Sequence, residues 1–441
     1  MNRRLIALLT LVLALGLAVA ACGGDDDEDT GGGGTGAGAG TEETGVTEGA
    51  EVIDPASMEG ASGNVTVCTG KDTAGEKSKG IEDFNKEYPD LNAKLLEFPE
   101  SADEQRNQFV QRQQAESDDC DVFVSDVIWT AEFAGQKWLY DLTPYVETRQ
   151  DEFIPSTLAT AQFDGKYWGV PRSTNAGFLF YRDNVTDEAP ATWQEVYELA
   201  KENDGLVYQG FAYEGLTVNF LELAFAAGGT VTNEDGTEAT INSPENVEAL
   251  QFMVDGIEDG AVPKATVTYK EEEARRAFEA GRASFMRNWP YAYGLGNMEG
   301  SKIANKFKVA PFPEWEGGGA AGILGGDNLV ISAFSQNPGG ALQLIDFWSS
   351  EAKEKEYAVE NSLAPVLTSV YSDPEVQEAQ PFAQELLQAV EQAKPRPVSP
   401  VYPQISQAIY RNVADALAGR AEPEAALEKA QSEIQDALET F

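Results

Sequence analysis

Residues 285–294 carry the side chains with the clearest chemical character, in the string FMRNWPYAYG. Trp289 and Tyr291 flank a proline, which breaks regular structure and predicts a loop. Aromatic faces stack on the C–H face of a sugar ring, and neighbouring amide and guanidinium groups hydrogen-bond to its hydroxyls. Packing inside a hydrophobic core explains the residues alone equally well. The string is therefore a candidate carbohydrate-binding surface with a structural alternative.

The absence of histidine limits the chemistry that the chain can perform. None of its 441 residues is histidine, so Ser-His-Asp and Cys-His catalysis and HExxH zinc sites are excluded. We expect no metal site and no cofactor. The 74 acidic residues leave open a pair of carboxylates that hydrolyses glycosides. Residues 70–78 resemble a phosphate-binding loop, but their lysine is displaced by one position, and we interpret them as a chance match.

The N-terminus predicts secretion. Arg3 and Arg4 precede an apolar run over residues 5–21, which ends in small residues followed by Cys22. This order is typical of a lipoprotein signal peptide over residues 1–21, with the lipid attached to Cys22. An ordinary signal peptide is the alternative. Residues 22–61 are rich in Gly, Asp, Glu and Thr and contain no aromatic residue, so we expect a flexible acidic tether.

The remaining length and charge describe the body of the protein. About 380 residues follow residue 61, which is too long for one core and suits two lobes. No second apolar stretch is long enough to cross a bilayer. The formal net charge of −43 repels nucleic acid, so we expect no nucleic-acid partner.

Two cysteines remain after Cys22, namely Cys68 and Cys120. Leftover cysteines in an oxidising compartment usually pair, and both flank predicted strands, so we expect a disulfide. Two buried free thiols are the alternative.

The hydrophobic pattern predicts alternating strands and helices. Strand patterns over residues 64–69, 94–98 and 121–126 are separated by helical patterns, which predicts a parallel sheet with helices on both faces. Thr192 and Ser243 are expected helix N-caps. Residues 374–441 are predicted to be mostly helical.

Several strings together resemble the extracellular solute-binding proteins that feed ABC sugar importers. The resemblance is to the maltose-binding-like group, in particular its trehalose/maltose-binding lipoproteins, and it covers essentially the whole body. The strings are FMRNWPYAYG, DVFVSDVIWTAEF at 121–133, LYDLTPY at 139–145, YEGLTVNFLE at 213–222, and residues 163–171 and 396–402.

The resemblance implies an α/β fold of the two-lobed periplasmic-binding-protein type (type II), with discontinuous lobes, a hinge and a ligand cleft between the lobes. The chain is expected to cross between lobes near residues 171–176, 317–324 and 365–374. The predicted N-terminal lobe is residues 62–172 and 323–370, and the predicted C-terminal lobe is residues 173–322 and 371–441.

The resemblance also assigns sugar-binding roles residue by residue. Trp289 and Tyr291 match stacking aromatics, and Asp126 matches an aspartate that binds sugar hydroxyls at the end of the third strand. The other expected cleft residues are Asp72, Arg106, Asn175, Glu214, Asp327 and Arg396.

Two positions depart from the family pattern. Related chains often have Gly-Gly-Trp where this chain has Gly-Gly-Asp327, and some have tyrosine at Ser173. We expect fewer stacking rings and more hydroxyl acceptors, which puts the identity of the sugar in doubt.

The function that follows from the resemblance is capture of a trehalose- or maltose-like disaccharide for an ABC importer. The expected partners are the sugar, the permease subunits of the importer and, through the lipid on Cys22, a membrane. We expect a monomer outside the cytoplasm that is not an enzyme. The alternatives are another oligosaccharide, glycoside or polyol in the same fold, and a surface enzyme that processes glycosides.

Overall fold

The computed structural model describes residues 47–440. The predicted signal peptide, Cys22 and the first part of the predicted tether lie outside the described residues. The described residues belong to the second of the two units of the chain, Gly45–Phe441. None of their helices is long and apolar enough to cross a membrane.

The first lobe is built on a five-stranded sheet with strand order β2-β1-β3-β11-β6. β1 runs parallel to β2 and β3, which confirms the parallel core predicted from the sequence, whereas β11 is antiparallel to β3 and β6. The strands are β1 (Gly63–Thr69), β2 (Leu91–Glu97), β3 (Val122–Asp126), β6 (Val170–Asn175) and β11 (Gly325–Ile331).

Successive side chains of a strand point to opposite sides of the sheet, so both faces of this sheet carry buried side chains and both are covered by other elements. Val122 and Val124 contribute to a large hydrophobic cluster that continues into the second lobe, whereas Phe123 between them packs with Phe109 and Phe133 in a separate cluster. The covering elements are η1 (Pro55–Met58), α1 (Glu76–Glu87), α2 (Ala102–Gln114), η2 (Val127–Trp129), α3 (Thr130–Gly135), α4 (Thr143–Val146), η3 (Gln150–Glu152), α5 (Pro155–Ala159), the hairpin β4 (Gln162–Phe163) and β5 (Lys166–Tyr167), α11 (Pro338–Trp348), α12 (Glu351–Asn361) and η5 (Thr368–Ser372).

The second lobe is built on a four-stranded sheet with strand order β10-β7-β9-β8. Its elements are β7 (Phe178–Arg182), α6 (Trp193–Glu202), β8 (Leu206–Val207), α7 (Glu214–Ala226), α8 (Pro244–Glu258), η4 (Lys264–Thr268), α9 (Glu271–Glu279), β9 (Phe285–Asn288), α10 (Tyr291–Asn297), β10 (Phe307–Ala310), α15 (Tyr402–Leu417) and α16 (Pro423–Leu438). The predicted caps are confirmed: Thr192 accepts a hydrogen bond from the Glu195 amide, and Ser243 accepts one from the Asn246 amide.

The prediction of a loop over residues 285–294 is wrong at both ends. Phe285–Asn288 forms β9, and Tyr291 begins α10. Pro290 immediately precedes the helix, where its missing amide proton breaks no helical hydrogen bond. The two aromatic residues therefore stand at a strand-to-helix junction.

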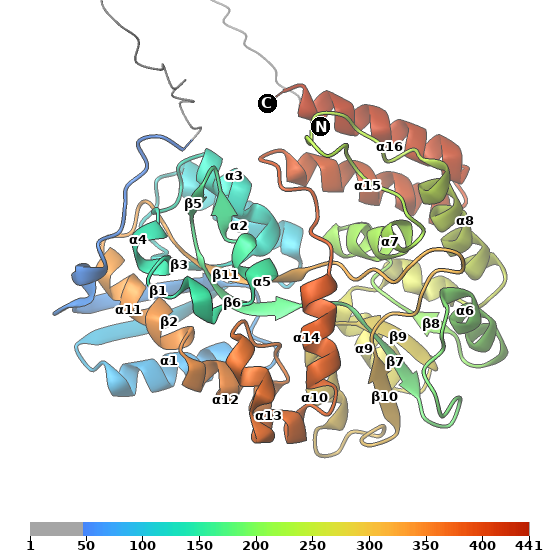
Figure 1. Cartoon of the computed structure of the whole chain (residues 1–441), viewed down its shortest axis with the longest axis horizontal. Helices are drawn as coiled ribbons and strands as arrows, with labels where there is room; N and C mark the ends of the chain where they lie inside the picture. The colour runs from blue at the N-terminus through green and yellow to red at the C-terminus, as the bar shows by residue number, and fades with distance from the viewer. Residues whose placement is uncertain (1–46, 441) are drawn as a thin grey trace, which may run out of the picture. The chain divides into compact units, whose positions relative to one another are not determined.

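The chain crosses between the lobes three times. The first crossing joins β6 to β7, as Figure 1 shows, and the second joins β10 to β11. For the third crossing, expected near residues 365–374, we propose residues 393–401, because α13 (Pro374–Ala379) and α14 (Ala383–Gln392) contact α12, η5 and α5 of the first lobe, although Phe382 before α14 also packs on Phe178 of β7. Leu386 and Val390 of α14 are fully buried there.

Residues 47–61 belong to the body, although their composition predicts a tether. The Thr47 amide and hydroxyl both donate to Asp164, at 3.1 and 2.8 Å. The Ile53 amide donates to the Asp141 carbonyl, and the Ile53 side chain is 3% exposed. One buried isoleucine and a short backbone pairing are enough to order this segment, and composition alone does not reveal them.

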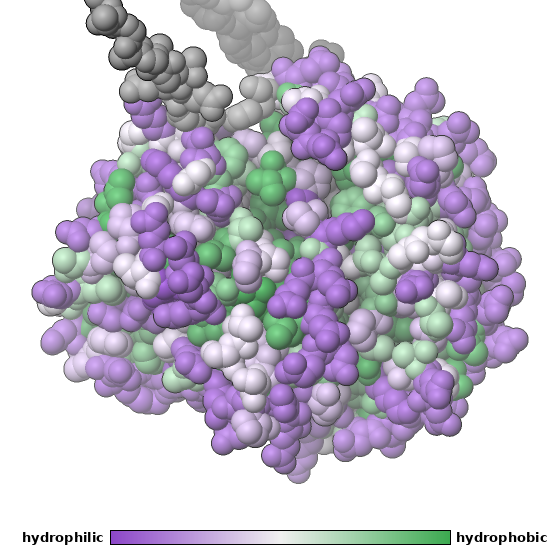
Figure 2. Space-filling model, in the orientation of Figure 1, coloured by the Kyte–Doolittle hydropathy of each residue, from purple (hydrophilic) through white to green (hydrophobic). Residues whose placement is uncertain are grey.

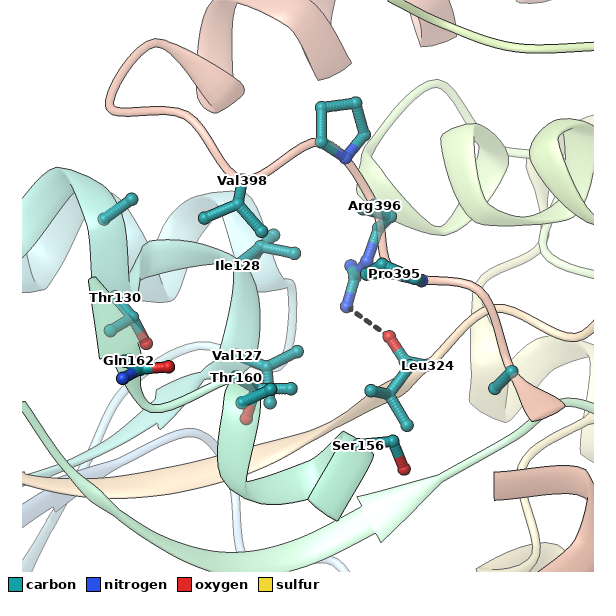
Figure 3. A pocket seen from close by; sticks show the side chains of 14 residues that line it. Val127, Ile128, Thr130, Ser156, Thr160, Gln162, Leu324, Pro395, Arg396 and Val398 are labelled. Atoms are coloured by element: carbon teal, nitrogen blue, oxygen red, sulfur yellow. Dashed lines mark hydrogen bonds between the residues drawn. The ribbon is translucent and has the colours of Figure 1, made fainter. Parts of the chain in front are cut away.

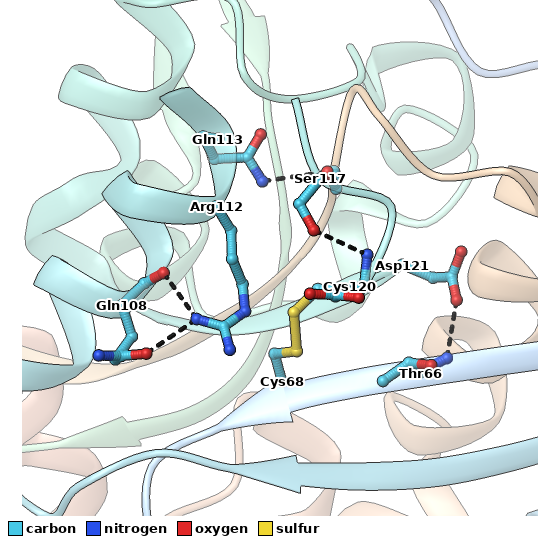
Figure 4. The surroundings of a disulfide bond; sticks show 10 residues. Thr66, Cys68, Gln108, Arg112, Gln113, Ser117, Cys120 and Asp121 are labelled. Atoms are coloured by element: carbon cyan, nitrogen blue, oxygen red, sulfur yellow. Dashed lines mark hydrogen bonds between the residues drawn. A yellow bond between two sulfur atoms is a disulfide. The ribbon is translucent and has the colours of Figure 1, made fainter. Parts of the chain in front are cut away.

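Cys68 and Cys120 form a disulfide with a Cα–Cα distance of 5.7 Å (Figure 4). It joins the end of β1 to the residues before β3 and is buried in the same cluster as Phe109. Nearby, Asp121 accepts a hydrogen bond from the Thr66 amide at 2.7 Å, which ties the two strands together a second time.

Candidate functional site

A cavity of about 270 Å³ lies where the two lobes and the crossing strands meet. First-lobe residues come from the loop after β1, the segment after β2 and the ends of β6 and β11, and second-lobe residues come from α9 and the junction of β9 and α10. The lining residues are Lys71, Thr73, Ala74, Glu76, Lys77, Glu100, Gln105, Arg172, Ser173, Asn175, Glu271, Glu272, Trp289, Tyr291, Asp327 and Leu363. Ligands of open α/β sheets bind at such strand ends.

The second-lobe wall of the cavity is aromatic. The Trp289 ring lies 3.9 Å from the Arg287 guanidinium carbon, and the Arg287 Nε donates to Glu222 at 2.8 Å. A Cβ atom at Gly325 would come within 3.2 Å of the Trp289 ring, so glycine at this position allows the indole to lie against β11. The Tyr291 hydroxyl donates to Glu272 at 3.0 Å. Both rings are therefore fixed in place by a charged neighbour.

The first-lobe wall is polar and charged. Arg172 is 2% exposed, and its guanidinium lies 3.4 Å from Glu76 and 4.0 Å from Asp327. The Ser173 hydroxyl donates to Asp327 at 3.2 Å. The two positions that depart from the family pattern, Ser173 and Asp327, are therefore in direct contact. Burial raises the pKa of Glu76, but Lys77 and Arg172 outweigh burial and keep this pKa below its ordinary value.

A second polar cluster connects the lobes beside the cavity and contains three predicted site residues. Arg396 donates to Glu214 at 2.8 Å and to Asp126 at 3.3 Å, and Tyr402 donates to Glu214 at 2.6 Å. Asp126 also caps η2 by accepting from the Ile128 amide. Burial raises the pKa of Asp126 to about 6 and raises that of Glu214, and Arg396 opposes both shifts. This cluster bridges β3, α7 and the third crossing.

The remaining predicted residues divide between the cavity and other roles. Asn175 lines the cavity with Trp289, Tyr291 and Asp327. Asp72 instead caps α1, accepting from the Lys77 and Ser78 amides at 3.3 and 2.9 Å. Arg106 pairs with Glu132 of α3, its Nε lying 2.7 Å from the carboxylate. Neither Asp72 nor Arg106 lines the cavity.

Sequence reasoning missed several lining residues. Lys71, Glu76 and Lys77 lie in the stretch that we interpreted as a chance match to a phosphate-binding loop, and Glu271 and Glu272 begin α9. Glu76 begins α1 just after the first predicted strand, so its position at a strand's carboxyl end was a usable signal. No comparable signal existed for Glu271, which begins a helix and does not follow a predicted strand.

A separate recess of about 220 Å³ lies along the third crossing (Figure 3). Val127 and Ile128 line it on the first-lobe side, and Pro395 and Val398 line it on the crossing side. Arg396 donates to the Leu324 carbonyl at 3.3 Å beside it. Figure 2 shows apolar residues gathered in the hollow between the lobes on this face. Thr130, Ser156, Thr160 and Gln162 also line the recess, but it has neither an aromatic ring nor a carboxylate, so we assign the candidate site to the other cavity. Among residues 47–440, no group of three His, Cys, Asp or Glu side chains is placed to hold a metal ion.

Comparison with known sequences identifies the family of the chain. The family model of bacterial extracellular solute-binding proteins matches residues 70–355. A probable ABC transporter-binding protein of Deinococcus radiodurans is 34% identical over 362 residues, covering 77% of this chain and 85% of that protein. The maltotriose-binding protein of Pyrococcus abyssi is 25% identical over 326 residues, covering 71% and 70%.

Comparison with solved structures gives the same fold. Maltose-bound T. maritima MalE3 matches with a TM-score of 0.82 at 38% identity, covering 85% of this chain and 99% of that chain. The GacH receptor of Streptomyces glaucescens, solved unliganded and with acarbose, matches with a TM-score of 0.78 at 24% identity, covering 86% and 99%. The second likeness supports the fold alone.

Proposed function

The chain belongs to the bacterial extracellular solute-binding protein family, and on this premise we propose that it captures a disaccharide of the trehalose or maltose type for an ABC importer. It binds the sugar between its lobes and presents the closed form to the permease subunits. It catalyses no reaction in this role. Its nearest functional partners are thus a neutral sugar and a membrane transporter.

The observation that carries this proposal is the composition of the cavity between the lobes. Trp289 offers a half-buried ring, and Asp327, Asn175 and Glu272 offer hydrogen-bonding groups within the same cavity. One face for the C–H surface of a sugar and several polar groups for its hydroxyls are the two requirements of carbohydrate recognition. The likeness to MalE3 at 38% identity supports a glucose-containing ligand.

The polar first-lobe wall supports a second candidate ligand within the same function. Asp327 and Ser173, the two positions expected to depart from the family pattern, are hydrogen-bonded to each other. A site with fewer rings and more hydroxyl acceptors would also suit another glycoside or a polyol. Solved proteins of the same fold bind ribitol and D-mannitol, at 22% and 21% identity to this chain.

We also propose that the protein is a lipoprotein, anchored through Cys22 outside the cytoplasm and monomeric. The support is the order of basic, apolar and small residues before Cys22. Mass spectrometry of the membrane fraction tests this proposal. A diacylated N-terminal peptide that is lost in Cys22→Ala is expected, and an unmodified mature chain beginning elsewhere would contradict it.

Isothermal titration calorimetry tests the sugar proposal directly. The body, residues 45–441, is titrated with trehalose, maltose, sucrose, maltotriose, ribitol and mannitol. We expect one-to-one binding of a disaccharide and at least a tenfold weaker affinity in Trp289→Ala, because the stacking surface is lost. Trp138→Ala is the matched control, since Trp138 is also half-buried but packs on Phe133 in the first lobe. A folded protein that binds none of these compounds would refute the proposal.

A further inference from the structure

Helix α7 of the second lobe begins without a side-chain cap from its own N-cap residue. Tyr213 occupies the N-cap position with an extended backbone, and its side chain makes no capping hydrogen bond within the described part of the chain. The first amide groups of a helix have no partner inside the helix, so they need an acceptor from elsewhere. Every residue of α7 except Phe225 is buried, so an acceptor from the protein itself matters here.

The acceptor comes from the other lobe. Asp103, in the first turn of α2, accepts a hydrogen bond from the Glu214 amide at 3.2 Å, and Glu214 is the first residue of α7. Figure 1 shows α2 in the first lobe and α7 in the second. A carboxylate is the preferred group at a helix N-terminus, because it accepts from the free amides and is attracted by the helix dipole. Asp103 therefore caps a helix of the opposite lobe.

Two further parts of the second lobe lie near the Asp103 carboxylate. Burial raises the pKa of Asp103, and this shift is opposed by the Glu214 amide, by Arg106 of the same helix and by Lys270 of the second lobe. Burial, and next the Asp103 carboxylate, raise the pKa of Tyr410 in α15. One first-lobe side chain thus faces α7, the residue before α9, and α15.

The residue that Asp103 caps is also part of the charged cluster beside the cavity. The Glu214 carboxylate accepts from Arg396 at 2.8 Å, and Arg396 also donates to Asp126 of the first lobe at 3.3 Å. Glu214 is therefore joined to the first lobe twice, directly through its amide and indirectly through its side chain. Asp103 does not line the cavity, so it holds the lobes together at a distance from the ligand.

We propose that Asp103 is a latch between the lobes, which caps α7 only in the closed form and so sets the closed–open equilibrium on which ligand affinity depends. A contact made in one of two forms shifts their equilibrium by its own free energy. Asp103 is in this role a positioning residue and does not touch the sugar. This inference rests on the proposed sugar-binding function. Direct contact of Asp103 with a sugar hydroxyl is the competing explanation, and it predicts effects that differ among sugars.

Calorimetry of the body, residues 45–441, tests the effect on affinity. Each sugar of the panel above that wild type binds is titrated into Asp103→Ala, Asp103→Asn and Glu104→Ala. We expect Asp103→Ala to weaken every sugar by the same factor, about three- to tenfold, because the cap is lost whatever the ligand. Asp103→Asn keeps an oxygen acceptor and should lose less. Glu104→Ala is the matched control and should have no effect, since Glu104 is an exposed acidic residue in the same first turn of α2.

The distance between the lobes gives a second readout, which needs no sugar. Nitroxide labels at Glu87→Cys and Glu202→Cys, two exposed positions at the ends of α1 and α6, report this distance by pulsed electron paramagnetic resonance. We expect the sugar-free wild type to contain a share of closed molecules and Asp103→Ala to reduce that share. At a saturating sugar concentration both proteins should show the same closed distance.

The outcomes separate this inference from the function on which it rests. Unchanged affinity in Asp103→Ala, or equal losses in Asp103→Ala and Glu104→Ala, would overturn the latch. A loss confined to one sugar would assign Asp103 to direct sugar contact and overturn the latch as well. Identical sugar-free distance distributions in wild type and Asp103→Ala would do the same. Failure of wild type to bind any sugar of the panel would refute the proposed function, and the distance measurement would then decide on the latch by itself.

Discussion

Replacement of Arg396 by methionine provides a strong test of the charged cluster between the lobes. The Arg396 guanidinium is buried and donates to Glu214, Asp126 and the Leu324 carbonyl. Methionine keeps most of the volume and removes the charge. The two carboxylates then face each other across the lobes without a cation between them.

The magnitude follows from the burial of the pair. Removing one partner of a buried ion pair costs about 3–5 kcal/mol, because the remaining charge is left without compensation. The hydroxyls of Tyr402 and Ser406 still donate to Glu214 and reduce this cost. We therefore expect Arg396→Met to lower the free energy of unfolding at pH 8 by about 3 kcal/mol.

The loss should depend on pH in a definite direction. Asp126 has a pKa of about 6 in the folded protein against an ordinary value of 3.8. A carboxyl group with a raised folded pKa binds its proton more tightly in the folded state, so its contribution favours folding at low pH and is lost as pH rises through 6. Arg396 lowers the pKa of both Asp126 and Glu214, and its removal raises both further. The difference between mutant and wild type should therefore be small at pH 5 and largest at pH 8.

Urea denaturation of residues 45–441 at pH 5, 6.5 and 8 measures this difference. Arg420→Met is the control, because its ion pair with Asp415 is largely exposed and should contribute less than about 1 kcal/mol at every pH. Adding Asp126→Asn to Arg396→Met should recover part of the loss at pH 8. A loss below about 1 kcal/mol at pH 8, or a loss of equal size at pH 5, would refute the reasoning.

Three further predictions concern other parts of the molecule. Replacing Cys68 and Cys120 by alanine should lower the free energy of unfolding by about 2–5 kcal/mol in chemical denaturation, because the bond closes a long loop; a stability equal to wild type would contradict this. Starting the body at residue 62 in place of residue 45 should lower the melting temperature, because the buried side chain of Ile53 is lost. An unchanged melting temperature would show that residues 47–61 contribute nothing to stability. Asp327→Asn should weaken the sugar found by calorimetry about tenfold or more, since a hydrogen bond to a charged group contributes about 1.5–3 kcal/mol, and unchanged affinity would remove Asp327 from the site.

The fold could be predicted from local patterns wherever one element carries its own signal. Val122–Asp126 is a run of buried residues that reads as a central strand, and Thr192 followed by Glu195 predicts a helix start. The position of the third crossing stays a prediction, because α13 and α14 show the same helical pattern in either lobe. Their assignment depends on which core receives Leu386 and Val390, and a single sequence does not contain that contact.

The site could be predicted only in part, because a single sequence does not show which distant segments contact each other. Asp126, Glu214 and Arg396 come from three distant segments, and the resemblance to known proteins named them without showing that they contact one another. Arg106 was expected in the cleft, which stays a prediction, and its guanidinium pairs with Glu132 within the first lobe. Side-chain direction depends on the nearest available partner, and this information is absent from motif spacing.

The polar wall of the cavity is a coupled set of residues, which constrains how its specificity can change. Burying an arginine costs several kcal/mol unless carboxylates compensate its charge. Arg172 lies between Glu76 and Asp327 and rests on the rings of Trp348 and Tyr357, at 5.4 and 5.3 Å. An aromatic residue in place of Asp327 would leave Arg172 with one carboxylate in place of two. An aromatic side chain at position 327 would therefore destabilise this wall, whatever stacking surface it offered to a sugar.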